Sequence, residues 1–274
     1  MDKKKVILIT GASAGMGKDF VQTLLADRHT VYGAARRLDK MGDIKNQGAK
    51  ILGMDVADDA SMVSGIETII KNEGRIDVLI NNAGFGLSGA IEDVSIAEAK
   101  YQMEVNLFGI GRLIQLILPQ MRKQHSGKII NITSLGGKIA MPMGGWYHAS
   151  KFALEGLSDS LRYEVKPFGI DVVVIQPGAV KSEWGDIAFD NVKRISGNGA
   201  YQGLTDSYIE AFKTSEKNAV NTNVIAKLVK KAVDTKKPKA RYNGGYLSNT
   251  MLFLRKLLPD SVFDLLITGM FKIS

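Results

Sequence analysis

Short apolar runs alternate with longer amphipathic stretches along most of the chain. The apolar runs include sequences such as VILIT and VVVI, and they lie at residues 6–10, 31–35, 51–55, 78–81, 128–133 and 171–176. The amphipathic stretches lie at residues 15–27, 58–72, 95–124 and 147–166, with another at 221–234. Strands that are apolar throughout and separated by helices are typical of a parallel sheet covered on both faces. The pattern therefore predicts an α/β fold with a doubly wound, mostly parallel sheet.

The pattern loosens after Pro177. Residues 183–205 are rich in glycine, asparagine and aspartate, so we expect a long loop there, and long loops of this kind usually have a functional role. Residues 243–274 form a C-terminal extension with amphipathic helical turns. Because no repeat or low-complexity linker divides the chain, we expect residues 1–274 to form a single domain.

The composition excludes several kinds of site. The chain of 274 residues contains no cysteine, which rules out disulfides and thiolate metal sites; its three histidines are scattered, so we expect no metal. The formal net charge is +8, and much of the excess lies in residues 227–241. No nucleic-acid-binding module accompanies this stretch. We therefore interpret it as a solvated surface and expect no nucleic-acid partner.

No stretch of the sequence is long and apolar enough to predict a membrane span. The nearest, residues 251–271, is interrupted by two basic and two acidic residues, and the apolar run near the N-terminus is too short for a signal peptide. We therefore expect a cytoplasmic protein. We interpret the amphipathic C-terminal segment as a packing element, and peripheral contact with a membrane surface is the alternative.

A glycine-rich turn, TGASAGMG at residues 10–17, joins the first predicted strand to the first predicted helix. Glycine lets the backbone turn sharply and approach a pyrophosphate closely, and the helix N-terminus supplies free N–H groups. The turn therefore predicts a dinucleotide site. The strict G-x-G-x-x-G spacing occurs at residues 84–89, but no predicted helix follows it, so we interpret that match as coincidental.

The second predicted strand is followed by Arg36 and Arg37. A chain that binds NAD places an aspartate or glutamate near this point, where it accepts a hydrogen bond from the ribose 2′-hydroxyl. Two guanidinium groups instead match the oxygens of a phosphate. The sequence therefore favours NADP(H) over NAD(H).

Tyr147 and Lys151 are four residues apart on a predicted helix, so both side chains project from one face. Ser134 follows the fifth predicted strand, at the sheet edge where open α/β sheets bind ligands. A lysine cation ~5 Å from a tyrosine contributes roughly 3 kcal/mol at an effective dielectric of ~20. That would lower the tyrosine pKa from ~10 towards ~8, which suits a general acid or base.

These motifs together resemble the classical short-chain dehydrogenase/reductase family over roughly residues 3–185. The matching elements are TGASAGMG at residues 10–17, Asp55 with Val56, NNAG at residues 81–84, Asn106, Ser134, YHASK at residues 147–151, and Pro177 with Gly178. The resemblance implies a Rossmann-type sheet of seven strands. It also implies an oxidoreductase that moves a hydride between NADP(H) and a carbonyl or secondary alcohol of a small molecule. A homodimer or homotetramer, paired through the helices that carry Asn106 and Tyr147, is implied as well.

The resemblance also implies a role for each residue of the site. Tyr147 would donate its proton to the substrate oxygen, Ser134 would hydrogen-bond that oxygen, and Lys151 would hold the nicotinamide ribose. Asn106 would anchor a water. The cofactor-binding residues predicted from the sequence and this resemblance are Gly11, Ser13, Ala14, Gly15, Met16, Gly17, Arg36, Arg37, Asp55, Val56, Asn82, Ala83, Gly84, Tyr147, Lys151, Pro177, Gly178, Val180 and Ser182.

Two questions stay open at this point. Trp184, Phe189 and Tyr201, with Met141 and Met143, either line an apolar substrate pocket or anchor the predicted loop. The protein is either the oxidoreductase described above or an NADP(H)-binding sensor without turnover. The joint presence of the predicted serine, tyrosine and lysine favours the enzyme.

Overall fold

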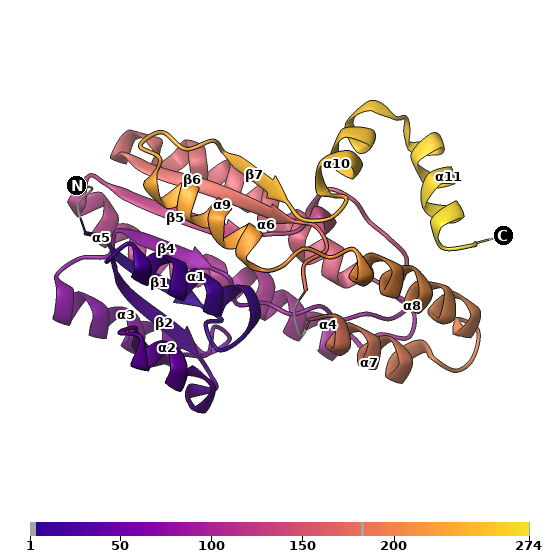
Figure 1. Ribbon diagram of the computed structural model, residues 1–274, viewed down its shortest axis with the longest axis horizontal. Helices are drawn as coiled ribbons and strands as arrows, with labels where there is room; N and C mark the ends of the chain where they lie inside the picture. The colour runs from indigo at the N-terminus through magenta and orange to yellow at the C-terminus, as the bar shows by residue number, and fades with distance from the viewer. Residues whose placement is uncertain (1–3, 182–183, 274) are drawn as a thin grey trace.

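The fold is built on one parallel sheet of seven strands (Figure 1). The computed structural model describes residues 4–181 and 184–273. The strands are β1 (Val6–Thr10), β2 (Thr30–Ala35), β3 (Lys50–Gly53), β4 (Val78–Asn81), β5 (Gly127–Ile132), β6 (Ile170–Pro177) and β7 (Arg241–Gly244). They pair in the order β3-β2-β1-β4-β5-β6-β7, and every pair is parallel. The predicted α/β fold is confirmed, and β1 to β6 lie where the apolar runs placed them.

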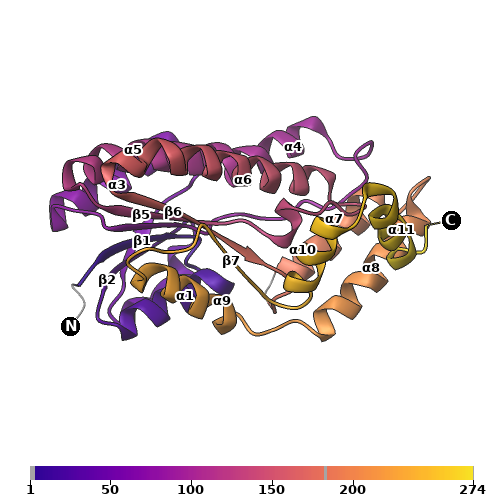
Figure 2. The same ribbon diagram turned by 90° about the horizontal axis from the view of Figure 1, so that it is seen from above.

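Helices cover both faces of this sheet (Figure 2). One face carries α3 (Asp59–Glu73), α5 (Gly109–Gln124) and α6 (Gly145–Val165), and the other carries α1 (Gly15–Ala26), α2 (Gly42–Asn46) and α9 (Asn223–Asp234). Each face has its own apolar core, with Ile69 and Leu113 fully buried in the first and Phe20 and Ile225 in the second. Burial of both faces explains why the central strands are apolar at successive positions.

A wider turn interrupts the helix predicted at residues 95–124. The segment consists of α4 (Ile96–Met103), a π-helical turn at Glu104–Phe108, and α5. A Cβ on Gly109 would lie 2.0 Å from the carbonyl oxygen of Val56, so the backbones approach too closely for any side chain at this position. The π-helical turn contains Asn106, and such turns occur frequently at functional sites.

The prediction of a long loop at residues 183–205 was wrong. The chain forms α7 (Trp184–Ser196) and the start of α8 (Gln202–Lys217) in this region. Val192 and Tyr208 are buried together in a third apolar cluster, separate from the two cores on the sheet. Asp190 is exposed on α7. The apolar face of each helix therefore outweighs the low helix propensity of the polar residues that suggested a loop.

The C-terminal extension adds an edge strand and two helices (Figure 1). β7 pairs with β6, and α10 (Ser248–Leu257) and α11 (Asp260–Met270) follow. Met251, Phe263 and Phe271 are buried in the third cluster, where the ring of Phe271 stacks on Tyr208 with centroids 6.2 Å apart. The inner faces of both helices therefore pack, as the sequence suggested. No helix in the described part of the chain is long and apolar enough to cross a membrane.

Glu155 on α6 is a buried charge that ties β7 to the rest of the sheet. Its side chain is 2% exposed. The carboxylate accepts hydrogen bonds from Thr133 Oγ1 (2.7 Å) after β5, Gln176 Nε2 (2.9 Å) on β6 and Arg241 Nε (2.9 Å) on β7. Lys138 Nζ forms an ion pair with it at 3.2 Å. Each oxygen of the buried carboxylate is therefore paired, which is what keeps an ionised group in such a position.

We expect Glu155→Gln to lower the free energy of unfolding by about 3 kcal/mol, because Lys138 would lose its anionic partner and Arg241 would keep only Asp159. Urea denaturation measures the loss. Glu164→Gln is the matched control, since Glu164 is exposed on the same helix and accepts a hydrogen bond from Ser160. Its expected cost is below about 0.5 kcal/mol. Equal losses in the two variants would contradict a stabilising role for the buried network.

Candidate active site

A cleft of about 540 Å³ opens at the carboxyl ends of the central strands. Here β1 pairs with β2 on one side and β4 on the other, so the chain connections diverge, and open α/β sheets bind ligands at such points. The predicted cofactor residues that line the cleft are Gly11, Ser13, Ala14, Gly15, Met16, Gly17, Arg36, Arg37, Asp55, Val56, Asn82, Ala83 and Gly84. The fold thus brings several separate segments of the sequence to one cleft.

The glycine-rich turn has the geometry that a pyrophosphate requires. Gly11 and Gly15 have φ angles of +67° and +51°, a region that favours glycine. A Cβ on Gly17 would lie 2.2 Å from the carbonyl oxygen of Gly11, so the turn is closed too tightly for a side chain there. Ala14 is the N-cap residue of α1, and its side chain makes no hydrogen bond to the helix. The first N–H groups of α1 are therefore left for an anion. These features fit a dinucleotide.

The side chains of Asn82 and Thr10 stabilise this turn through hydrogen bonds. Asn82 Nδ2 donates to the backbone oxygens of Thr10 (3.0 Å) and Gly11 (3.2 Å). The buried hydroxyl of Thr10 accepts from the backbone N–H groups of Asn82 and Ala83, both at 3.0 Å. Asn82 therefore holds the turn in shape, besides lining the cleft. The sequence analysis missed the contribution of Thr10, although its place before the first glycine of the motif marks it.

The predicted catalytic side chains meet beside the cleft. Lys151 Nζ lies 5.9 Å from the centroid of the Tyr147 ring and donates to the backbone oxygen of Ile132 (3.0 Å). Ser134 follows β5, and its hydroxyl lies near enough to that of Tyr147 to lower the pKa of the phenol. A Cβ on Gly84 would lie 3.7 Å from Lys151 Nζ, so the lysine also reaches the loop after β4. The arrangement can hold an oxygen atom of a ligand between two hydroxyl groups.

Asn106 links the π-helical turn to this group. Its Nδ2 donates to the backbone oxygen of Phe85 (2.9 Å) and to Ser150 Oγ (3.1 Å), and its Oδ1 accepts from the backbone N–H of Phe85 (3.1 Å). Ser150 Oγ in turn donates to the backbone oxygen of Tyr147 (2.7 Å). Asn106 therefore fixes the loop after β4 against the catalytic helix. Ser150, which stands within the YHASK motif, is a positioning residue that the sequence analysis did not single out.

Comparison with known proteins agrees with this geometry. The model of the short chain dehydrogenase family matches residues 5–191. The chain belongs to the short-chain dehydrogenase family. It is 38% identical to a 3-ketodihydrosphingosine reductase of Bacteroides thetaiotaomicron over 265 residues, 95% of each chain. It is 35% identical to the probable short-chain type dehydrogenase/reductase VdlC of Helicobacter pylori, over 96% of this chain and 97% of that one. A solved short-chain dehydrogenase from Streptomyces avermitilis superposes with a TM-score of 0.82 at 31% identity, covering 97% and 95% of the two chains.

The short-chain dehydrogenase motif at Pro177 and Gly178 lies outside the residues that line the cleft. A Cβ on Gly178 would lie 2.4 Å from the backbone oxygen of Tyr246, so this glycine permits close packing against the chain after β7. The backbone of Val180 forms an isolated β-bridge with that of Val220, which lies in the segment before α9. Ser182 lies outside the described residues.

The side chains proposed to line a substrate pocket divide into two groups. Met141 and Met143 belong to the third apolar cluster with Tyr208, and Tyr208 lies near enough to Tyr147, the predicted catalytic tyrosine of this short-chain dehydrogenase, to affect its pKa. Phe189 packs edge-on against a ring of α8, with centroids 5.0 Å apart. Tyr201 instead donates from its hydroxyl to Glu92 at the surface, which anchors the segment. The side chain of Trp184 lies outside the described part of the chain.

Burial governs the pKa values of Tyr147 and Lys151, the predicted catalytic pair. It raises the pKa of Tyr147 to about 12, although the hydrogen bond with Ser134 lowers it; the proximity of Tyr208 raises it further. Burial also lowers the pKa of Lys151 to about 8, while the charge of Glu155 raises it. Burial therefore opposes the predicted shift of the Tyr147 pKa towards ~8, because desolvation disfavours the phenolate.

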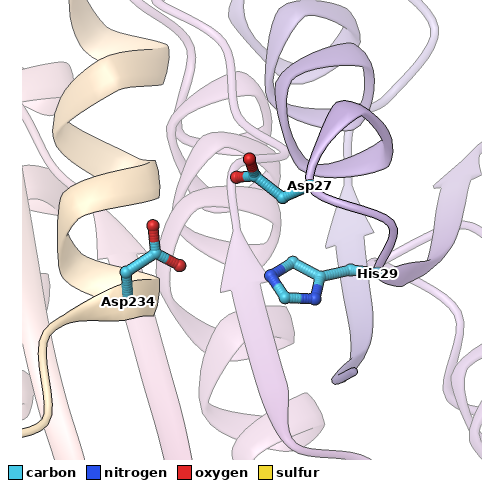
Figure 3. Close-up of side chains that lie close together, drawn as sticks. All are labelled: Asp27, His29 and Asp234. Atoms are coloured by element: carbon cyan, nitrogen blue, oxygen red, sulfur yellow. The ribbon is translucent and has the colours of Figure 1, made fainter. Parts of the chain in front are cut away.

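A separate group of side chains meets the spacing of a cation site within residues 4–181 and 184–273. Asp27, His29 and Asp234 place ligand atoms within 4.8 Å of one another (Figure 3). The ammonium of Lys230 already contacts Asp27 and donates to Asp234 Oδ2 (2.9 Å). The backbone N–H of Lys5 donates to His29 Nδ1 (3.3 Å), so the proton of a neutral ring lies on Nε2. We therefore interpret the group as an ion-pair network that joins α1 to α9.

We expect the stability of the wild type, relative to Lys151→Met, to rise by about 2 kcal/mol between pH 8 and pH 10. The pKa of buried Lys151 is lowered from 10.5 to about 8. In this window the folded protein has released the proton that the unfolded chain still binds, so raising the pH favours the folded state. Urea denaturation of both proteins at each pH measures the difference. A constant difference, or one that shrinks as the pH rises, would contradict a depressed lysine pKa.

Proposed function

We propose that this chain is an NADP(H)-dependent oxidoreductase that transfers a hydride between the nicotinamide and a carbonyl or secondary alcohol of an apolar substrate. The observation that carries the proposal is the meeting of Ser134, Tyr147 and Lys151 beside a cleft with the geometry of a dinucleotide site. When bound, the nicotinamide supplies or accepts the hydride. The protein orients the reactants and manages the proton.

Tyr147 is the proton donor when the substrate is a carbonyl compound. Its hydroxyl stays protonated at neutral pH, because burial raises its pKa above the ordinary value of a phenol, so the proton is present to be donated. Ser134 donates a second hydrogen bond to the same substrate oxygen as negative charge develops there. The proton that leaves Tyr147 is replaced through Lys151, whose pKa of about 8 lies near the operating pH. These proton positions favour the direction of carbonyl reduction.

Arg36 and Arg37 support NADP(H) as the cofactor. Both line the cleft directly after β2, where a carboxylate would select NAD(H). The Arg36 side chain is 63% exposed, so its guanidinium is accessible to a ligand in the cleft. Its nearest carboxylate, Asp55, is an ion-pair partner at 3.9 Å, a loose contact that a phosphate can replace.

The surroundings of Tyr147 support an apolar carbonyl substrate. Tyr208, Met143, Ile139 and Met251 converge in the third cluster, which is built from α8, α10, α11 and the loop before α6. The relative from Bacteroides thetaiotaomicron is named as a reductase of a keto compound. That name supports the same class of reaction for this chain.

We expect Tyr147→Phe to lower the rate of NADPH-dependent ketone reduction by about 10²- to 10⁴-fold, because the general acid is lost. Its affinity for NADPH, measured by calorimetry, should stay within about twofold of wild type, since one hydroxyl among many contacts is removed. Tyr163→Phe is the control, because Tyr163 is exposed on the same helix. A wild-type protein that binds NADPH and turns over no ketone in a broad panel would favour the sensor instead.

We also propose a homodimer or homotetramer that pairs through the helices carrying Asn106 and Tyr147. Phe108, Phe152 and Leu157 are exposed large apolar side chains on the π-helical turn and α6, in the single chain. Burying such a face on a second copy removes it from water. We expect light scattering to give at least twice the mass of one chain, and Phe152→Glu to reduce it. A monomeric wild type at micromolar concentration would contradict the assembly.

A further inference from the structure

The rim of the cleft contains a hydrogen bond between two distant parts of the sequence. Arg36 Nη1, from the end of β2, donates to Tyr101 Oη on α4 at 2.9 Å. Both residues line the cleft, together with Asp55 and Val56. Tyr101 is 44% exposed, and its ring packs against Phe85 with centroids 5.7 Å apart. The contact with Phe85 therefore helps to hold the Tyr101 hydroxyl group in the cleft.

Because Arg36 is the donor in this hydrogen bond, the hydroxyl hydrogen of Tyr101 can still be donated to a ligand. The guanidinium has no acceptor atom, so the tyrosine oxygen must be the acceptor and its own O–H hydrogen stays available for another group. The guanidinium also keeps further N–H donors, because an arginine has five. A phosphate in the same place accepts hydrogen bonds through several oxygens, and charge-assisted bonds to it are the strong ones.

We propose that Tyr101 is a specificity-determining residue that distinguishes NADP(H) from NAD(H). It holds the Arg36 guanidinium at the rim of the cleft and donates its hydroxyl hydrogen to the 2′-phosphate. This inference rests on the proposed use of NADP(H). It adds a neutral donor, contributed by α4, to a site that the sequence attributed to the two arginines after β2.

In this proposal the Tyr101 hydroxyl affects only the binding of the 2′-phosphate, which NADP(H) carries and NAD(H) lacks. The ring of Tyr101 packs on Phe85 whether or not it carries oxygen, so phenylalanine at this position keeps that contact. NADH lacks the 2′-phosphate, so it offers the hydroxyl no charged acceptor at this point. Removal of the hydroxyl should therefore weaken the binding of NADPH and spare that of NADH.

The test is calorimetric titration of the full chain with NADPH and with NADH, for wild type, Tyr101→Phe and the control Tyr163→Phe. Tyr163 is a suitable control because it also contacts an arginine, Arg162, but is 71% exposed and lies outside the cleft-lining residues. We expect Tyr101→Phe to weaken NADPH binding roughly tenfold, as for loss of a hydrogen bond to a charged group. Its NADH affinity and both affinities of the control should change by less than about twofold.

A second comparison tests whether Tyr101 acts together with Arg36. In an Arg36→Ala background, we expect the further change Tyr101→Phe to cost distinctly less than tenfold in NADPH affinity, because the two groups share one phosphate. Equal weakening of NADPH and NADH by Tyr101→Phe would mean contact with the part common to both cofactors and would overturn the inference. No change in either affinity would overturn it as well. A wild type that binds NADH as tightly as NADPH would overturn the proposed cofactor together with this inference.

Discussion

The parallel pairing of β1 with both β2 and β4 is the constraint on which the rest of the structure depends. Parallel neighbours need crossover connections, and these place helices over both faces of the sheet. They also bring the carboxyl ends of all the strands to one edge. Where the connections on either side of β1 diverge, the edge stays open as the cleft. The Thr10 hydroxyl lies at this point and joins the end of β1 to the loop that follows β4.

Three buried polar side chains of this molecule, Glu155, Asn131 and Lys151, differ in how they are paired. Glu155 is surrounded by donors, including two cations, and serves to hold β7 in the sheet. Asn131 is likewise satisfied, since it accepts from Asn81 (2.8 Å) and donates to Ser158 (2.9 Å). Lys151 instead faces a neutral backbone oxygen, and its pKa moves towards the uncharged form. Lys128 shows the same effect, since it donates to three backbone oxygens and burial lowers its pKa to about 8, so desolvation shifts a lysine pKa wherever the partners are neutral.

The two ends of the site are built in different ways. The cofactor end consists of short segments that each follow a strand, so the sheet alone brings them together. The proposed substrate end depends on α7, α8, α10 and α11, which pack in a cluster beyond the sheet (Figure 2). Tyr208 links this cluster to Tyr147, because its hydroxyl lies 3.1 Å from Ser88 Oγ, its ring stacks on Phe271 and its proximity raises the pKa of Tyr147. Changes in the C-terminal helices can therefore alter the substrate end and leave the cofactor end intact.

The sequence by itself determined the parts of this protein whose signals are local. Apolar runs located β1 to β6, and spacing along one helix aligned Tyr147 with Lys151, because strand burial and helical periodicity depend on near neighbours in the chain. The tertiary structure alone decided the contacts between distant segments. These include β7 fixed by Glu155, the helices α7 and α8, and the pairing of Arg36 with Tyr101. It also decided the direction of the Tyr147 pKa shift, because that depends on how much water the surrounding fold removes from the hydroxyl, and no spacing in the sequence records this.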